Sequence, residues 1–332
     1  MGDTTQSVPV FADVLGAAER LAGVAVMTPL VESPILSERV AARVFLKLEI
    51  LQRTGSFKFR GAYNRLSLFS PKERKAGVVS FSSGNHAQGI AAAAGMLGMP
   101  ATIVMPSDAP AIKIANTKAL GAVVVLYDRK RESREEIAAA IARDKGAIVV
   151  PSFDDPGIIA GQGTAGLEIA RQARAAGVRL DTVLVPCSGG GLTSGIALAM
   201  HHESPSTRVF AVEPEGFDGA RLSLERGERV AAKGGETIAD ALMSTAPGVL
   251  TFAVLKACRA GGVAVNDQAL MRGVSYAARS LKLVVEPGGA AALAALLSGA
   301  FEAKGKAIAV VLSGGNIDPA MLVRCMDAQP TP

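Results

Sequence analysis

Residues 182–196, TVLVPCSGGGLTSGI, contain three consecutive glycines between an apolar run and a helix-forming stretch. The β-branched run at 182–185 predicts a strand, and the stretch at 192–201 predicts a helix. Glycines let backbone N–H groups turn toward an anion at a helix N-terminus, where the helix dipole favours negative charge. No lysine follows the glycines as in a Walker loop, and they lack the spacing of a dinucleotide fingerprint. This βα unit predicts an α/β fold with a phosphate-binding loop; a glycine-rich turn without a ligand is the alternative.

The alternation of strand and helix continues on both sides of this unit. Further strands are expected at 78–81, 102–105, 123–127, 148–150, 209–212, 263–265 and 308–312. Further helices are expected at 85–97, 111–120, 134–144, 158–176, 254–259, 270–281 and 290–297. Repeated βα units of this kind form parallel sheets that helices cover on both faces. Two successive runs of them predict two such sheets with a cleft between them.

The composition is that of a globular chain. Of its 332 residues 49% are apolar and 20% are charged, which excludes disorder. Aromatic residues make up only 4%, and the basic residues behind the net charge of +5 are scattered, so we expect no nucleic-acid partner. Three cysteines, at 187, 258 and 325, are too few and too far apart for a disulfide framework or a zinc site, which favours the cytoplasm. The apolar stretch at 91–99 is too short to cross a membrane, and no membrane association is expected.

Lys58 stands between two phenylalanines, Phe57 and Phe59. Apolar neighbours desolvate an ammonium group and lower its pKa. A neutral amine is what Schiff-base chemistry requires, so Lys58 is a candidate nucleophile. The alternative is an ordinary helix lysine whose amine extends to solvent.

Two further segments follow predicted strands, where ligands of open α/β sheets bind. The first begins with Ser82 and Ser83 and continues through Asn85 and His86, whose hydroxyls, amide and backbone N–H groups make a cradle for a carboxylate. Simple helix capping by Ser83 is the alternative. The second segment begins at Ser313, whose hydroxyl can point into the same cleft or belong to an ordinary turn.

Taken together, five motifs resemble the serine/threonine dehydratase and serine racemase group of fold-type II pyridoxal-phosphate enzymes. In chain order they are SFKFRGA, SSGNHAQG, CSGGGL, VEPGGAAAL and LSGGN. The resemblance runs from about residue 28 to residue 316. It implies a tryptophan synthase β-like fold, with a larger cofactor-binding domain (1–75 and 155–332) and a smaller, mobile domain (76–154) that carries the substrate loop.

The resemblance also implies which residues hold pyridoxal 5′-phosphate. Lys58 matches the lysine that binds the cofactor covalently, and Phe57 matches a residue packed near its ring. Asn85 matches the partner of the 3′-oxygen, and Ser313 matches the partner of the pyridine nitrogen. The loop that binds the phosphate is matched by Ser188, Gly189, Gly190, Gly191 and Leu192.

Four residues match the loop that holds the substrate carboxylate: Ser82, Ser83, Asn85 and His86. Lys58 and Ser83 are the expected catalytic residues, with Lys58 as the base for the α-proton and Ser83 as a possible second base on the opposite face. For a divalent cation, relatives that bind one place a Glu and, six residues later, an Asp. Glu213 matches the first, but Gly219 stands at the second position with Asp218 beside it, so a cation at Glu213 is left open.

The implied function is a pyridoxal-phosphate-dependent lyase of amino-acid metabolism. We expect a dehydratase (ammonia-lyase) that eliminates the β-hydroxyl of L-threonine or L-serine to give a 2-oxo acid and ammonia. The alternatives in the same fold are a serine or aspartate racemase, or a dehydratase of 3-hydroxyaspartate or another 3-hydroxy amino acid. A nicotinamide-dependent dehydrogenase is disfavoured because no dinucleotide fingerprint follows the first predicted strand at 78–81, and a non-catalytic binding protein is disfavoured by Lys58. The expected partners are a small amino-acid substrate and other copies of the chain, in a homodimer or homotetramer.

Overall fold

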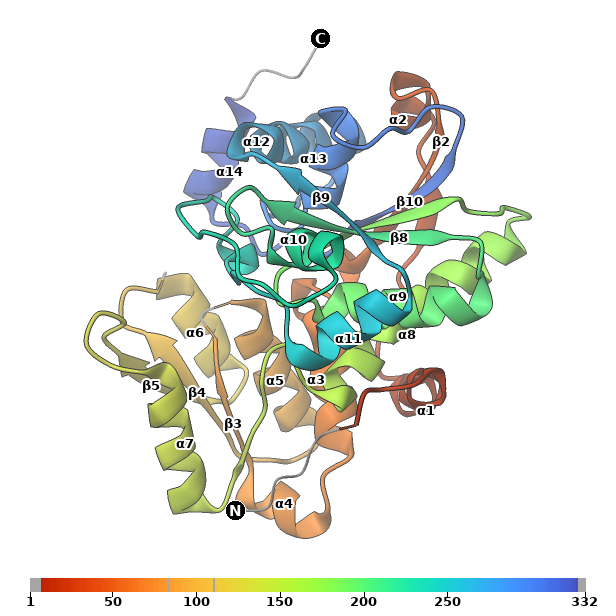
Figure 1. The fold of residues 1–332 in the computed structure, drawn as a ribbon. Helices are drawn as coiled ribbons and strands as arrows, with labels where there is room; N and C mark the ends of the chain where they lie inside the picture. The colour runs from red at the N-terminus through yellow and green to blue at the C-terminus, as the bar shows by residue number, and fades with distance from the viewer. Residues whose placement is uncertain (1–6, 83, 110, 328–332) are drawn as a thin grey trace.

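The computed structural model describes residues 7–82, 84–109 and 111–327. Figure 1 shows two bodies of sheet and helix, a larger one that holds β7 to β10 and a smaller one that holds β3 to β5. Both sheets have helices on both faces (Figure 1). This is the α/β architecture with two open parallel sheets that the sequence predicts.

The larger sheet has six strands in the order β1-β2-β10-β7-β8-β9. All neighbours are parallel except β1 and β2, which pair in antiparallel register. The strands are β1 (Leu30–Glu32), β2 (Arg43–Leu48), β7 (Thr182–Pro186), β8 (Arg208–Pro214), β9 (Gly261–Val265) and β10 (Ala307–Leu312). Their central strands are buried on both faces, so they are continuously apolar.

The smaller sheet is entirely parallel, in the order β5-β4-β3-β6. Its strands are β3 (Val78–Phe81), β4 (Ala101–Pro106), β5 (Val123–Tyr127) and β6 (Ile148–Val149). They all fall within the predicted smaller domain; the domain boundaries at 75/76 and 154/155 and its mobility stay predictions.

Successive side chains along each strand of the larger sheet point to opposite faces, so the core has one part on each face. Leu184 packs with the α12–α13 side, whereas Val183 and Val185 pack with α8 and α9. The helices are α1 (Phe11–Leu21), α2 (Pro34–Arg39), α3 (Lys58–Ser67), α4 (Pro71–Ala76), α5 (Asn85–Met96), α6 (Ala111–Ala119), α7 (Arg134–Lys145), α8 (Pro156–Ala175), α9 (Gly191–Glu203), α10 (Gly219–Arg226), α11 (Val249–Ala257), α12 (Asp267–Tyr276), α13 (Ala291–Leu297) and α14 (Pro319–Met326). Short 3₁₀ or π turns lie at η1 (Glu49–Leu51), η2 (Arg53–Gly55), η3 (Asp240–Leu242) and η4 (Ala277–Leu281).

The predicted strands are all present, with ends that differ by at most two residues. The helix expected at 254–259 instead begins at Val249, because Gly248 and the carboxylate of Asp154 cap it there. The elements expected from the sequence do not include β1, β2, α1, α2, α3, α10 or α14. Of these, β2 matters most, since it pairs with β10 inside the larger sheet.

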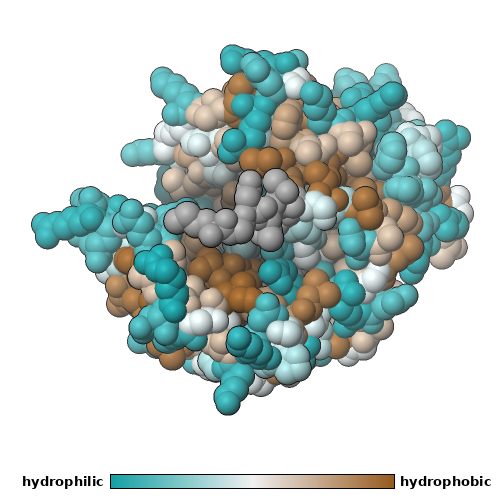
Figure 2. Space-filling model, turned by 60° about the horizontal axis from the view of Figure 1, so that its bottom comes forward, coloured by the Kyte–Doolittle hydropathy of each residue, from teal (hydrophilic) through white to brown (hydrophobic). Residues whose placement is uncertain are grey.

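The surface seen from below Figure 1 mixes hydrophilic and hydrophobic groups. Figure 2 shows hydrophilic side chains spread around the rim of this face, with hydrophobic groups gathered nearer its centre. None of the described helices combines the length and the apolar composition that a bilayer crossing would require.

Candidate active site

A cavity of about 310 Å³ opens between the two sheets. It lies beyond the carboxyl ends of β3, β7 and β10, where an open α/β sheet binds its ligand. The predicted site residues that line it are Phe57, Lys58, Ser82, Asn85, His86, Ser188, Gly189, Gly190, Gly191, Leu192 and Ser313. Ser83 lies outside the described residues, although both its neighbours line the cavity.

Lys58 is the first residue of α3 and reaches the cavity wall. The preceding segment is held against the loop after β10, because Ser56 bridges Gly314 and the Phe57 N–H donates to the Ser313 carbonyl at 3.1 Å. The Lys58 Nζ donates to the carbonyl of Ser152 at 2.8 Å. Burial lowers the pKa of Lys58 to about 8, against the opposing effect of the Glu286 carboxylate. An appreciable fraction of this amine is therefore neutral near physiological pH.

The glycine-rich loop connects the end of β7 to the start of α9. Gly190 has a φ of +97°, in the left-handed region that favours glycine. A Cβ at Gly189 would collide with the ring of Phe153, and the Gly189 carbonyl accepts a hydrogen bond from the Thr251 hydroxyl at 2.7 Å. The N–H groups of Gly191 and Leu192 belong to the first turn of α9, where no intrahelical acceptor exists. The loop therefore offers N–H donors and a positive helix end to an anion in the cavity.

The amide of Asn85 is held from both sides. Its Nδ2 donates to the Glu286 Oε1 at 2.5 Å, and its Oδ1 accepts from the Asn316 Nδ2 at 2.7 Å. Burial and the nearby Asp240 raise the pKa of Glu286 to about 7. A Cβ at Gly314 would collide with this carboxylate, so the second glycine motif makes room for Glu286.

The ring of His86 is buried and uncharged. Its Nε2 lies 3.4 Å from the Val150 carbonyl, and its Nδ1 has no hydrogen-bond partner among the described residues. Burial and the nearby Lys58 ammonium lower the pKa of His86 to about 3. A neutral ring offers a substrate a hydrogen bond but no positive charge.

Four charged residues of the cavity, Glu286, Lys113, Arg134 and Asp240, were not predicted from the sequence. Glu286 lies in the VEPGGAAAL motif, where an acidic residue between apolar residues and glycines was the available signal. Lys113 and Arg134 come from α6 and α7, and only the fold brings them to the cavity. Lys113 Nζ donates to the Asp240 carboxylate at 2.7 Å, and the Arg134 guanidinium carbon lies 5.2 Å from the centre of the Phe81 ring.

Glu213 lies away from the cavity, near the end of β8. Its carboxylate accepts the N–H groups of Ala220 at 3.0 Å and Arg221 at 2.8 Å, and burial raises its pKa to about 8. Among the described residues, no group of three or more His, Cys, Asp or Glu side chains could hold a metal ion. A metal-binding role for Glu213, which could also draw on carbonyl oxygens, stays a prediction.

The cavity fits a phosphate-bearing aldehyde. The loop before α9 offers N–H groups to a phosphate, and a Cβ at Gly189, Gly190 or Gly191 would crowd Phe153 or Thr251. Lys58 supplies a primary amine with a lowered pKa beside that loop. The unpartnered Nδ1 of His86 is the kind of buried polar atom that a bound molecule satisfies.

Comparison with known proteins identifies that molecule. The family model described as "Pyridoxal-phosphate dependent enzyme" matches residues 22–314. An L-threo-3-hydroxyaspartate ammonia-lyase from Pseudomonas sp. is 45% identical, covering 92% of this chain and 95% of that protein. An L-threonine ammonia-lyase from Thermotoga maritima is 42% identical, covering 95% of this chain and 77% of that protein. The structure of maize serine racemase has a TM-score of 0.90 at 35% identity, covering 96% of this chain and 97% of that one.

These similarities confirm the predicted fold, cofactor and class of enzyme. Both sequence relatives are ammonia-lyases, and the chain is an enzyme of the lyase type that uses pyridoxal phosphate. With matches over almost its whole length, the chain belongs to the family of pyridoxal-phosphate dependent enzymes.

Proposed function

We propose that this enzyme removes the β-hydroxyl and the amino group of a 3-hydroxy amino acid, giving a 2-oxo acid and ammonia. The observation that carries the proposal is the Lys58 amine, with a pKa lowered to about 8, in one cavity with the glycine-rich loop. The relatives that are ammonia-lyases of hydroxyaspartate and threonine support the same reaction class.

Pyridoxal phosphate, when bound, supplies an aldehyde that captures amines and a ring that withdraws electrons from the α-carbon. Lys58 would hold it and then take up the α-proton of the substrate. The N–H groups of residues 188–192 would hold the phosphate, with Phe57 beside the ring. Asn85 would donate to the 3′-oxygen. Ser313 would place a neutral hydroxyl at the pyridine nitrogen, which favours prompt loss of a β-substituent over transamination.

The cavity favours a substrate with two carboxylates. Lys113 and Arg134 line it from α6 and α7 of the smaller body; Lys113 is paired with Asp240 in the cavity, and Arg134 with the exposed Glu135. An α-carboxylate needs only the N–H groups and hydroxyls at the start of α5, whereas a β-carboxylate gains from a guanidinium partner. Among the substrates expected from the sequence, we therefore favour 3-hydroxyaspartate, with L-threonine and L-serine as the second candidates.

The substrate assignment is tested by measuring the release of 2-oxo acid from a panel of 3-hydroxy amino acids. L-threo-3-hydroxyaspartate should have a higher kcat/KM than L-threonine or L-serine. Arg134→Gln should lower kcat/KM for hydroxyaspartate about 10- to 100-fold, since a hydrogen bond to a charged group contributes about 1.5–3 kcal/mol. The same variant should change kcat/KM for L-serine less than about threefold.

The matched control is Arg129→Gln, which removes an exposed arginine paired with Asp108 outside the cavity. It should leave both substrates unaffected. If Arg134→Gln lowers both activities equally, or if hydroxyaspartate does not react, the two-carboxylate assignment is wrong and L-threonine or L-serine takes its place.

Racemisation is a separate outcome that depends on whether Ser83 acts as a second base. If Ser83 is a second base, Ser83→Ala should reduce the formation of D-isomer far more than L-elimination. Turnover of L-serine in heavy water, with deuterium measured in recovered D- and L-serine, follows both routes at once. Abundant deuterated D-serine that disappears in Ser83→Ala would establish the racemase alternative.

We also propose that the enzyme acts in the cytoplasm as a homodimer or homotetramer. Three free and widely separated cysteines, two of them buried, support a reducing compartment. Sedimentation of the purified chain at several concentrations tests the assembly; a monomer throughout would contradict it.

A further inference from the structure

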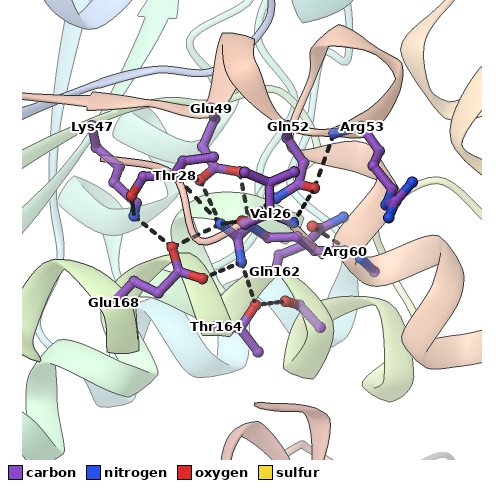
Figure 3. Close-up of polar contacts among 12 residues, drawn as sticks. Val26, Thr28, Lys47, Glu49, Gln52, Arg53, Arg60, Gln162, Thr164 and Glu168 are labelled. Atoms are coloured by element: carbon purple, nitrogen blue, oxygen red, sulfur yellow. Dashed lines mark hydrogen bonds and ion pairs between the residues drawn. The ribbon is translucent and has the colours of Figure 1, made fainter. Parts of the chain in front are cut away.

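A buried ionic cluster lies behind the first turn of α3. Its central residue is Arg60, which follows Lys58 by two residues and is 1% exposed. The guanidinium donates to both oxygens of Glu49, at 2.8 Å each, and to both oxygens of Glu168, at 2.7 and 2.9 Å. Figure 3 shows Arg60 between these two carboxylates.

Lys47 completes the cluster from β2. Its Nζ donates to the Glu168 Oε2 and to the Thr28 carbonyl, both at 2.6 Å (Figure 3). The Thr28 hydroxyl in turn donates to Glu49 at 2.5 Å. Two cations and two carboxylates thus join β2, η1, α3 and α8 in one neutral network whose charged groups are all hydrogen-bonded.

Stability alone does not account for such a network. A buried ion pair loses solvation when it forms, and well-packed apolar side chains of similar volume often stabilise a core as well or better. Contacts between apolar side chains are not directional, so they do not fix one orientation of a helix. A guanidinium with two bidentate partners accepts only one orientation, so it defines the rotation of the helix that carries it.

The rotation of α3 decides where the Lys58 amine points. Residues two apart on a helix are about 200° apart around its axis. Arg60 faces the ionic cluster, and Lys58 faces the cavity on the opposite side of α3. The helix also lies close to α8, where a Cβ at Gly161 would meet the Gly61 Cα at 2.6 Å. A small rotation about this contact would swing the amine away from the glycine-rich loop.

We propose that Arg60, held between Glu49 and Glu168, is a positioning residue that sets the direction of the Lys58 amine. The proposal rests on the proposed role of Lys58 in holding the cofactor. It assigns to the second charged residue of the SFKFRGA motif a function at a distance from the substrate.

The test compares Arg60→Lys and Glu168→Gln with a control on the same helix, Arg65→Lys. Arg65 pairs with Asp155 and does not line the cavity. Arg60→Lys keeps the charge but cannot bind two carboxylates in bidentate fashion. Glu168→Gln keeps the shape, and its partly exposed side chain makes it the milder change, which decides the test if Arg60→Lys does not fold.

The main readout is the rate at which the apoprotein captures the cofactor. Mixed with pyridoxal phosphate over a range of pH, the apoprotein should gain its visible absorption band at least about 10-fold more slowly in both cluster variants. The visible circular dichroism of the bound cofactor should change, and kcat should fall with little change in KM. Arg65→Lys should match the native protein within about twofold in all three.

The proposal would be overturned if folded Arg60→Lys or Glu168→Gln kept the native capture rate, pH profile and dichroism. A lowered Tm in such a variant would mean that the cluster is structural only. Lys58→Ala separates this from the proposed function. If Lys58→Ala still captures the cofactor and turns over substrate, the role of Lys58 is wrong; if it is inactive while the cluster variants are native, only the positioning role is wrong.

Discussion

At the scale of the residue, burial explains the lowered pKa of Lys58. Contrary to what the sequence suggests, the two phenylalanines that flank it do not both contribute. Phe57 lies beside the amine, 5.2 Å from Nζ to the ring centre. Phe59 points instead into the core with Leu66 and Ile90, because successive helix residues are about 100° apart. Burial lowers the pKa of the amine, and of the two flanking rings only Phe57 lies beside it.

Replacing Glu286 should shift the pH dependence of cofactor capture. The Glu286 carboxylate raises the pKa of Lys58, so Glu286→Gln should lower that pKa below its present value of about 8. Capture requires the neutral amine, and its rate rises with pH through the pKa. The rising limb should therefore move to lower pH in the apoprotein, followed by stopped-flow absorbance. A midpoint that stays in place or moves upward would show that Glu286 does not act on Lys58.

Ser313→Ala should slow elimination while leaving the fold intact. Removal of one polar contact at a reacting centre commonly costs about 10²–10³-fold in rate. A ring nitrogen without its hydroxyl partner should give a loss of about this size in kcat, with little change in Tm. An unchanged kcat would mean that another group holds the pyridine nitrogen.

At the scale of the element, local patterns predicted every strand of both sheets except β1 and β2. β2 reads RVFLKL, and the lysine next to its end argues against a strand inside a sheet. The structure buries Lys47 completely, which is possible because Glu168, Gln172 and the Thr28 carbonyl satisfy its ammonium. These partners lie up to 125 residues away, so no local pattern announces them.

Residues 161–166 of α8, GQGTAG, have the spacing of a dinucleotide-binding motif but serve helix packing. Their spacing is that of G-x-G-x-x-G, yet they lie inside a 20-residue helix rather than at the start of one. A Cβ at Gly161 would meet α3, one at Gly163 would meet α1 and α9, and one at Gly166 would meet α9. The glycines therefore allow close helix packing and bind no nucleotide.

Gly161→Ala should consequently destabilise the protein by about 1–3 kcal/mol, as expected when a packed contact is overfilled. Gly16→Ala in α1 is the matched control, because its Cβ would meet only the flexible end of Arg20, at 3.3 Å. The control should stabilise α1 by about 0.5–1 kcal/mol. Urea unfolding of both variants measures the difference; equal stabilities would argue against the close α3–α8 contact.

At the scale of the whole molecule, the site exists only because two sheets meet. The predicted cofactor residues after β3, β7 and β10 were recognisable one motif at a time. Lys113 and Asp240 were not, since they join α6 of the smaller body to η3 of the larger one across the cavity. Sequence motifs thus predicted the cavity residues that follow these strands, whereas Lys113, Arg134 and Asp240 reach the cavity only through the arrangement of the two bodies.

A ligand that binds only in the assembled cleft should stabilise the entire chain. At a free concentration 1,000-fold above its dissociation constant, pyridoxal phosphate should add about 4 kcal/mol to the free energy of unfolding. The Tm of the apoprotein should rise with cofactor concentration, and Lys58→Ala should show a smaller rise. Calorimetric scans at several concentrations measure this, and a Tm independent of the cofactor would contradict binding in the cleft.

If Lys58 holds pyridoxal phosphate in this cavity, borohydride reduction fixes the cofactor to that lysine. The purified holoenzyme is reduced, digested, and searched by mass spectrometry for the pyridoxyl-phosphate label. We expect a yellow protein that loses its colour on reduction, with the label on the peptide that contains Lys58. A label on Lys113, which lines the same cavity, or no chromophore after reconstitution would show that Lys58 does not hold the cofactor.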